Sequence, residues 1–364
     1  MPGASERPDR RQTTTNYPLT TAMNMQFERK LTIPMEVKKM YPLTGTLADT
    51  VADRAAALRA IFTGQSSKLL LIIGPCSADD PDAVLDYCTR LRKVQTQVAD
   101  QMLIVPRVYS NKPRTKGDGY MGLLHQPIAD GKPDLFQGIL AVRQLHLQVL
   151  AATGFTCADE LLYPENYRYV DDLLAYVTVG ARSVENQQHR LTASGLDIPV
   201  GMKNPTSGAL TPMLNAIAAA QKPHSFLYRG WEVHSSGNDL AHAVLRGYHN
   251  EDGQPISNYD AAVLQRLLEG YASEQLQNPA VIIDVNHDNS GKNPLAQPEI
   301  VRRGLALRKA DPAFKRLIKG FMVESYLVDG AQEPGGGTYG QSITDPCLGW
   351  EKTERLILDL AEAL

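Results

Sequence analysis

The sequence predicts an α/β fold, a (β/α)8 TIM barrel with an N-terminal extension and an inserted β-hairpin after its sixth strand. Eight short apolar runs recur along the chain, and segments with the apolar spacing of a helix lie between most of them. The runs are continuously apolar rather than alternating, which is typical of parallel strands covered on both faces. A length of 364 residues suits one such barrel with additions.

The expected elements follow one another in a simple order. Residues 1–64 precede the first strand and form the N-terminal extension, with a helix over 45–63, and residues 65–364 form the barrel. The strands are expected at 69–75, 102–109, 156–162, 177–181, 198–202, 224–228, 280–285 and 320–323. Helices are expected at 82–97, 138–152, 209–221 and 259–275. The long interval after the sixth run predicts the inserted hairpin, which carries Arg246.

The composition argues against several classes of partner. The formal net charge is −3, so no overall positive field would attract nucleic acid. No apolar stretch approaches the roughly 20 residues that a membrane-spanning helix needs. Residues 1–20 also lack the apolar segment of a secretory signal. The four cysteines are scattered without a CxxC pair, which favours reduced thiols and a cytoplasmic location.

One group of residues has the chemistry of a metal site. Cys76, His287 and Glu324 follow the first, seventh and eighth strands, and barrel closure places the eighth strand beside the first. Asp345 follows in a loop that can return to the same rim. Taken singly, the cysteine could be a buried structural residue and the histidine a hydrogen-bonded loop residue. Together, the four suit a divalent Mn, Fe, Co or Zn ion.

A second group is cationic and predicts anionic substrates. Its members are Arg107, Lys112, Arg114, Lys116, Arg182, Lys203 and Arg246. Arginine offers planar bidentate contacts to phosphate or carboxylate, and lysine offers a point charge. The segment 112–115, "KPRT", reads as a compact phosphate grip, with a solvated loop as the alternative. Metal and cations together favour a small phosphorylated substrate whose carbonyl oxygen meets the metal.

Eight ordered motifs resemble one family. They are "GPCS" (74–77), "PRVYSNKPRT" (106–115), "VGARSVENQQHR" (179–190), "PVGMKNPTSG" (199–208), "SSGN…LRG" (235–247), "IDVNHDNSGK" (283–292), "GFMVESYLVDG" (320–330) and "SITDPCLGW" (342–350). From about residue 45 to its end the chain closely resembles the type I 3-deoxy-D-arabino-heptulosonate 7-phosphate (DAHP) synthases. These enzymes open the shikimate pathway to the aromatic amino acids.

The resemblance implies an activity and a role for each matched residue. The activity is condensation of phosphoenolpyruvate with D-erythrose 4-phosphate to DAHP and phosphate, in a homodimer or homotetramer with an aromatic amino acid as effector. The implied metal ligands are Cys76, His287, Glu324 and Asp345. The implied phosphoenolpyruvate site is Arg107, Ala181, Arg182, Lys203 and Arg246, and the erythrose 4-phosphate site is Lys112, Pro113, Arg114 and Thr115. Catalytic roles fall to Lys112, which can move a proton between the substrates, and to Cys76 and His287.

Two departures from the family leave alternatives open. Met121 stands where relatives commonly have a lysine near phosphoenolpyruvate, so either Lys116 compensates or the affinity for phosphoenolpyruvate is lower. Asp159 and Glu160 are placed differently from the carboxylate of some relatives. A related condensation with another phosphorylated or amino-substituted aldose is therefore the alternative activity. A barrel that binds an effector to regulate another enzyme is the non-enzymatic alternative, but all four ligand positions are filled.

The N-terminal extension is expected to serve assembly and feedback control rather than catalysis. Residues 31–43, "LTIPMEVKKMYPL", carry apolar side chains that an isolated barrel would leave exposed, and such segments often mark an interface. The alternative is a plug that covers the N-terminal end of the barrel.

Overall fold

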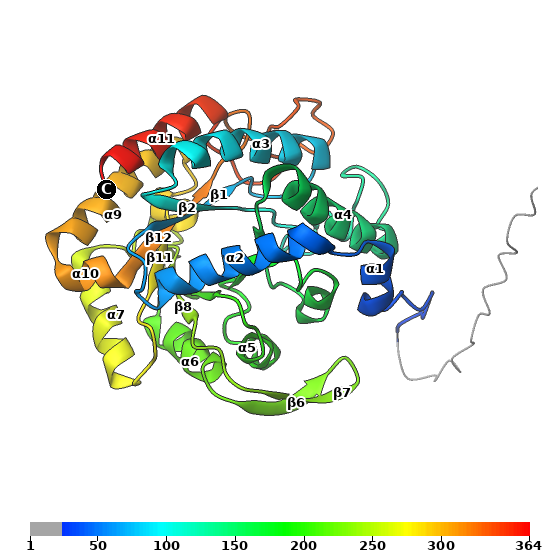
Figure 1. Cartoon of the computed structure of the whole chain (residues 1–364), viewed down its shortest axis with the longest axis horizontal. Coiled ribbons are helices and arrows are strands. Elements are labelled where there is room, and N and C mark those ends of the chain that lie inside the picture. Colours follow the sequence, from blue (N-terminus) through cyan, green and yellow to red (C-terminus); the bar gives the residue numbers. More distant parts are fainter. Residues whose placement is uncertain (1–23) are drawn as a thin grey trace, which may run out of the picture.

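The computed structural model describes residues 24–364, in which eight parallel strands curl into a barrel (Figure 1). Strand β1 (Leu69–Gly74) pairs with both β2 (Met102–Pro106) and β12 (Ile318–Glu324). A bridge between Arg107 and Ala158 joins the two remaining edges and closes the ring. The other barrel strands, in order, are β3 (Cys157–Glu160), β4 (Leu174–Val179), β5 (Val200–Lys203), β8 (Ala241–Leu245) and β11 (Val281–Asp284). The fold predicted from the sequence is confirmed.

Helices surround the barrel. They are α1 (Pro34–Met40), α2 (Gly45–Phe62), α3 (Pro81–Val98), α4 (Leu135–Thr153), η1 (Pro164–Tyr169), α5 (Gln187–Ser194), α6 (Leu210–Ala220), α7 (Ala261–Ser273), α8 (His287–Ser290), η2 (Pro294–Ala296), α9 (Gln297–Ala310), α10 (Pro312–Leu317) and α11 (Trp350–Glu362). Several begin at an aspartate whose carboxylate accepts N–H groups of the first turn, as Asp80, Asp134 and Asp260 do. In the described part of the chain, no helix is long and apolar enough to cross a membrane.

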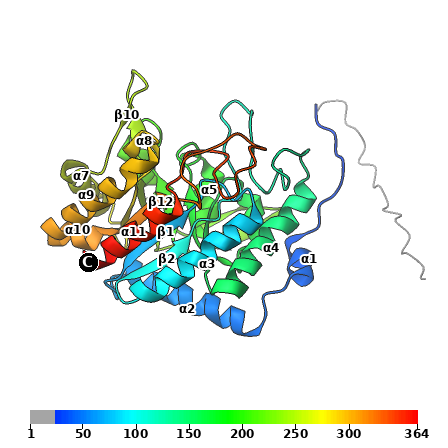
Figure 2. The same cartoon turned by 90° about the horizontal axis from the view of Figure 1, so that it is seen from above.

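Helix α2 closes the N-terminal end of the barrel. Its side chains Leu58, Ile61 and Phe62 are buried with inward-facing strand residues such as Tyr176 and Val244. The long loops of the mouth lie at the opposite end (Figure 2). Residues 45–62 thus pack against the barrel core, and the role in assembly and feedback control that the sequence predicts for the extension stays a prediction.

A larger apolar core fills the space between the strands and the surrounding helices. It includes all four cysteines of the chain, Cys76, Cys88, Cys157 and Cys347, each free and buried. No disulfide therefore constrains the fold, and its stability comes from this packing.

The sixth barrel strand is not where the sequence predicted it. Residues 224–228 form β6 (His224–Tyr228), which pairs antiparallel with β7 (Trp231–Ser235) in a hairpin beside the barrel. The barrel strand is β8, so the hairpin precedes the sixth strand, and Arg246 follows β8 rather than belonging to the hairpin. The prediction failed because "AHAVL" is rich in alanine, a weak strand former, whereas "HSFLY" is aromatic. A second, smaller hairpin, β9 (Tyr248–His249) with β10 (Pro255–Ile256), follows β8.

Candidate active site

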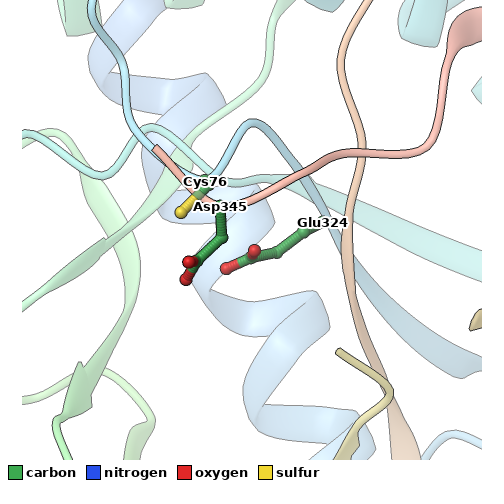
Figure 3. A group of neighbouring side chains, drawn as sticks. All are labelled: Cys76, Glu324 and Asp345. Carbon is green, nitrogen blue, oxygen red and sulfur yellow. The ribbon is translucent and has the colours of Figure 1, made fainter. Parts of the chain in front are cut away.

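Three of the predicted metal ligands meet at the C-terminal mouth of the barrel (Figure 3). Cys76 follows β1, and Glu324 ends β12, whose pairing with β1 sets Gly74 opposite Glu324. Asp345 reaches them from the loop that follows β12. One potential ligand atom from each of Cys76, Glu324 and Asp345 lies within 4.8 Å of the others.

His287, the fourth predicted ligand, stands at the edge of this group. Its Nε2 lies 3.8 Å from Glu324 Oε1, and its Nδ1 lies 2.8 Å from Asp284 Oδ2. The residue begins α8 with a φ of +43°, a left-handed conformation that is uncommon outside glycine. The structure therefore brings all four predicted donors to one side of the mouth, with His287 outside the compact group of three.

The protonation of this group depends on burial and on Lys112. Burial raises the pKa of the Cys76 thiol and Glu324 raises it further, whereas Lys112 Nζ, 2.9 Å from the sulfur, opposes both. Burial alone would also raise the pKa of Asp345, but Lys112 and His287 hold it well below its ordinary value. A thiol, an imidazole and carboxylates fit a borderline divalent cation, whose charge favours the thiolate.

Glu324 is held in place from three sides. Arg107 Nη2 donates to its Oε1 at 2.8 Å, and Asn286 Nδ2 donates to its Oε2. Gln297 exchanges two hydrogen bonds of 2.8 Å with its backbone. Asn286 and Gln297 could not be predicted from the sequence, because amides carry no charge pattern and their contacts depend on how the loops fold.

Arg107 is a fully buried cation of the predicted phosphoenolpyruvate site. Burial would lower its pKa, but Glu324 and the other acidic groups around it together raise the pKa above its ordinary value, so the guanidinium stays charged. The guanidinium also lies over the ring of Tyr109, 3.9 Å from its centre. Its Nη1 has no hydrogen-bond partner among the described residues, so one buried donor stays open to an anion.

Lys203 and Arg246 are two further buried cations, each beside a carboxylate. Lys203 ends β5, and its Nζ lies 3.8 Å from Asp284 Oδ2. Burial lowers the pKa of Lys203. Arg246 follows β8, and its Nη1 lies 2.6 Å from Oδ2 of Asp288, a residue that the sequence analysis did not single out. Both cations are therefore held in fixed positions.

The remaining predicted substrate residues are more exposed. Arg182 is exposed and makes no hydrogen bond or ion pair with another described residue, and Ala181 before it is half-buried. Pro113 and Arg114 are half-buried and Thr115 is exposed. Arg114 Nε donates to the carbonyl oxygen of residue 120 at 2.7 Å, so its loop folds back over it.

The two carboxylates that end β3 face different partners. Asp159 accepts hydrogen bonds from Ser110, which begins the loop of the predicted phosphate grip. Glu160 lies against Gly180, where a Cβ atom would come within 2.5 Å of its Oε1. A side chain at this position, immediately before Ala181, would therefore displace the carboxylate of Glu160.

The chain is similar in sequence and structure to known proteins. The model of the DAHP synthetase I family matches residues 37–357. The Phe-sensitive phospho-2-dehydro-3-deoxyheptonate aldolase of Escherichia coli (strain K12) is 37% identical over 345 residues, which cover 92% of this chain and 95% of the relative. The Trp-sensitive one of Enterobacter agglomerans is 35% identical over 342 residues, covering 92% and 95%. The solved structure of the aldolase from Francisella tularensis SCHU S4 superposes with a TM-score of 0.86 at 30% identity, covering 93% and 98%.

Proposed function

The chain belongs to the DAHP synthetase I family, and from this premise we propose that it condenses phosphoenolpyruvate with D-erythrose 4-phosphate in a metal-dependent reaction. The products are DAHP and inorganic phosphate, which commits carbon to the aromatic amino acids. The observation that carries the proposal is the meeting of Cys76, Glu324 and Asp345 at the barrel mouth, beside buried cations that suit two phosphorylated substrates.

The metal would be held by Cys76, His287, Glu324 and Asp345, whose mixed donor set suits Mn, Fe, Co or Zn. When bound, the ion would polarise the aldehyde oxygen of the sugar phosphate as a Lewis acid. Hydrogen bonds from Arg107, Asn286 and Gln297 hold Glu324 in position as a ligand for the ion.

The chain's own residues would bind and orient the two substrates. Arg107, Lys203 and Arg246, with Arg182 at the rim, would take the phosphate and carboxylate of phosphoenolpyruvate. The backbone of Ala181 would lie beside them. Residues 112–115 would grip the phosphate of the aldose, with Arg114 as its bidentate contact.

Lys112 would move a proton between the substrates. Its Nζ donates to both the sulfur and the carbonyl oxygen of Cys76 at 2.9 Å, so the ammonium is fixed at the mouth. The methylene carbon of phosphoenolpyruvate attacks the aldehyde carbon, and Lys112 gives its proton to the oxygen that becomes a hydroxyl. Water then adds at the former enol carbon, and phosphate leaves with cleavage of the carbon–oxygen bond.

The decisive experiment measures phosphate release from phosphoenolpyruvate that depends on the aldose. Chelation should reduce turnover by at least 100-fold, and Mn²⁺ or Co²⁺ should restore it. Cys76→Ala should lose the metal and most activity while staying folded, whereas Cys88→Ala, at an equally buried thiol in α3, should keep both. Full activity after exhaustive chelation, or a Cys76→Ala enzyme as active as Cys88→Ala, would refute metal dependence.

Met121 supports a second candidate, in which the acceptor is a different phosphorylated or amino-substituted aldose. The residue is half-buried, and its carbonyl oxygen accepts the N–H of Lys112 at 3.1 Å, so it lies beside the predicted sugar site. Comparing kcat/KM for erythrose 4-phosphate with that for longer and amino-substituted aldoses separates the two candidates. The acceptor with the higher value is the one this chain selects.

Relatives named Phe-, Tyr- and Trp-sensitive support feedback control of this chain by an aromatic amino acid. A hollow of about 590 Å³ lies between η1, α5 and the hairpin β6–β7. Its walls include the rings of Tyr167, Phe226 and Tyr228 and charges of both signs from Lys38 and Asp197, a combination that suits an aromatic zwitterion. We place the effector there, in a homodimer or homotetramer. The free cysteines favour the cytoplasm as its compartment.

A further inference from the structure

Ser110 is the point at which the loop of the phosphate grip begins and ends. Its carbonyl oxygen accepts the N–H of Leu124 at 3.1 Å, which ties the end of the loop to its start. Gly122 has a φ of +99°, and a Cβ atom there would come within 2.4 Å of the Ser110 carbonyl oxygen. Residues 111–123 therefore form a closed loop whose base is Ser110, and this loop carries both Lys112 and Arg114.

Asp159 holds that base from the neighbouring strand. Its Oδ1 accepts the N–H of Ser110 at 2.9 Å and that of Glu160 at 2.7 Å, and its Oδ2 accepts the Ser110 hydroxyl at 2.5 Å. Bonds of this length between a hydroxyl and a carboxylate are charge-assisted and among the stronger hydrogen bonds in proteins. Both carboxylate oxygens are thus used, and two of the three bonds go to one residue of the loop.

Asp159 lies in an environment that disfavours a charged carboxylate. The side chain is buried, and its hydrogen bonds within the described part of the chain come from Ser110 and Glu160 and not from a lysine, arginine or histidine. Burial raises its pKa to about 7, against the effect of the hydrogen bonds from Ser110. Near neutral pH the carboxylate is therefore stabilised by its hydrogen bonds and not by a cation.

We propose that Asp159 is a positioning residue, which acts through Ser110 to set where the loop presents Lys112 and Arg114 to the aldose phosphate. The inference rests on the proposed function, because it takes these two cations as the aldose grip. Lys112 Nζ must reach Cys76 at 2.9 Å while Arg114 turns back on the loop, and a shift at the base would displace both.

The test is a split between the two substrates. Ser110→Ala removes only the hydroxyl and should raise KM for erythrose 4-phosphate at least fivefold, with KM for phosphoenolpyruvate changed less than twofold. Asp159→Asn should act in the same direction. Ser110→Thr keeps a hydroxyl and should restore most of the lost affinity. Ser194→Ala, at a buried serine bonded to Ser235 in the hairpin, is the matched control and should leave both KM values unchanged.

Failure of the positioning role and failure of the proposed activity give different results. Equal rises in both KM values, or Ser110→Ala kinetics like those of Ser194→Ala, would overturn the positioning role. A wild-type enzyme without aldose-dependent phosphate release would instead overturn the proposed function. If Asp159→Asn does not fold, Ser110→Ala carries the test alone, because it leaves the carboxylate in place.

Discussion

Individual cations at the mouth occupy different surroundings, and this difference predicts two separable anion sites. Lys203 is buried beside Asp284, whereas Arg114 lies in a half-buried loop. Lys203→Ala and Arg182→Ala should raise KM for phosphoenolpyruvate about tenfold or more, and Arg114→Ala should do the same for erythrose 4-phosphate. Steady-state kinetics with each substrate varied in turn would measure both effects.

Lys116 provides the control for this division. It lies in the same loop as Arg114 but is exposed. Lys116→Ala should change KM for erythrose 4-phosphate less than twofold if the aldose site is specific to the half-buried arginine, whereas a rise in KM for phosphoenolpyruvate would mean that Lys116 replaces the lysine absent at Met121. Equal effects of the three main substitutions on both substrates would reject two separate sites.

Buried histidines predict acid sensitivity of the fold, and His242 is the most deeply buried of them. In the barrel interior, His242 Nδ1 donates to the carbonyl oxygen of Leu240, and its Nε2 accepts from Tyr176, both at 2.8 Å. This neutral form is fully bonded, and burial lowers the pKa of His242 to about 3. The unfolded chain binds a proton near pH 6.5 and the native chain does not, so the free energy of unfolding falls as the pH drops from 6.5 toward 3.

The contribution of His242 should be about 2 kcal/mol between pH 7 and pH 5. His242→Gln should therefore flatten the dependence of unfolding free energy on pH over this range, measured by urea titration at each pH. His234→Gln, at a histidine on the hairpin that pairs with Ser225, should leave the slope unchanged. Identical slopes for His242→Gln and the wild type would contradict this assignment.

At this scale, sequence order was enough to group the metal-competent residues, because barrel closure makes the ends of the first and last strands neighbours. The same reasoning could not find Asp288 beside Arg246, since that contact depends on the left-handed turn at His287. Nor could it show that His287 lies outside the compact group of three. Strand ends can be predicted from a pattern, but side-chain directions in loops cannot.

At the scale of the elements, apolar runs in the sequence locate most of the barrel strands but not all of them. Seven of the eight predicted runs overlap barrel strands, and the apolar pattern is clearest in β1, "LLLIIG", and weakest in β3, "CADE". The sixth was misplaced because β6 forms its hairpin with β7 outside the barrel, where its residues are partly exposed in alternation. The burial of β8 comes from its neighbours β5 and β11, which a local window of sequence does not contain.

Helix α2 predicts that part of the extension is required for folding. Phe62 is buried, and its ring centre lies 4.3 Å from that of His242 inside the barrel. Phe62→Ala should lower the free energy of unfolding by about 3–5 kcal/mol, because it leaves a cavity that the strands cannot fill. Leu227→Ala, at a side chain 72% exposed on the hairpin, should change it by less than about 0.5 kcal/mol. Similar losses for both would show that α2 is not part of the core.

At the scale of the whole molecule, the segment before α2 contributes no residue to the predicted active site at the mouth. Deleting this segment should therefore leave catalysis intact. Helix α1 exposes Met35 and Met40 and contributes Lys38 to the hollow beside the hairpin. Removing residues 1–44 spares α2, so light scattering should show a smaller oligomer, inhibition by Phe, Tyr and Trp should be lost, and catalysis should remain.

Lys38→Ala tests inhibition separately from assembly, because it alters the hollow and keeps the apolar surface of α1. It should weaken inhibition without changing the oligomer. An unchanged oligomer with unchanged inhibition after the deletion would rule out a regulatory role for the segment. A soluble but inactive barrel would mean that these residues support the fold instead.

The burial of every cysteine makes the enzyme ready for site-specific labelling. Because Cys76, Cys88, Cys157 and Cys347 are all shielded, the native chain presents no exposed thiol to a maleimide dye. A cysteine introduced at Trp231, which is 74% exposed where β7 begins, would be the preferred site of attachment. A fluorophore there could report in real time whether the hairpin moves when an amino acid enters the adjoining hollow, without first removing the native cysteines.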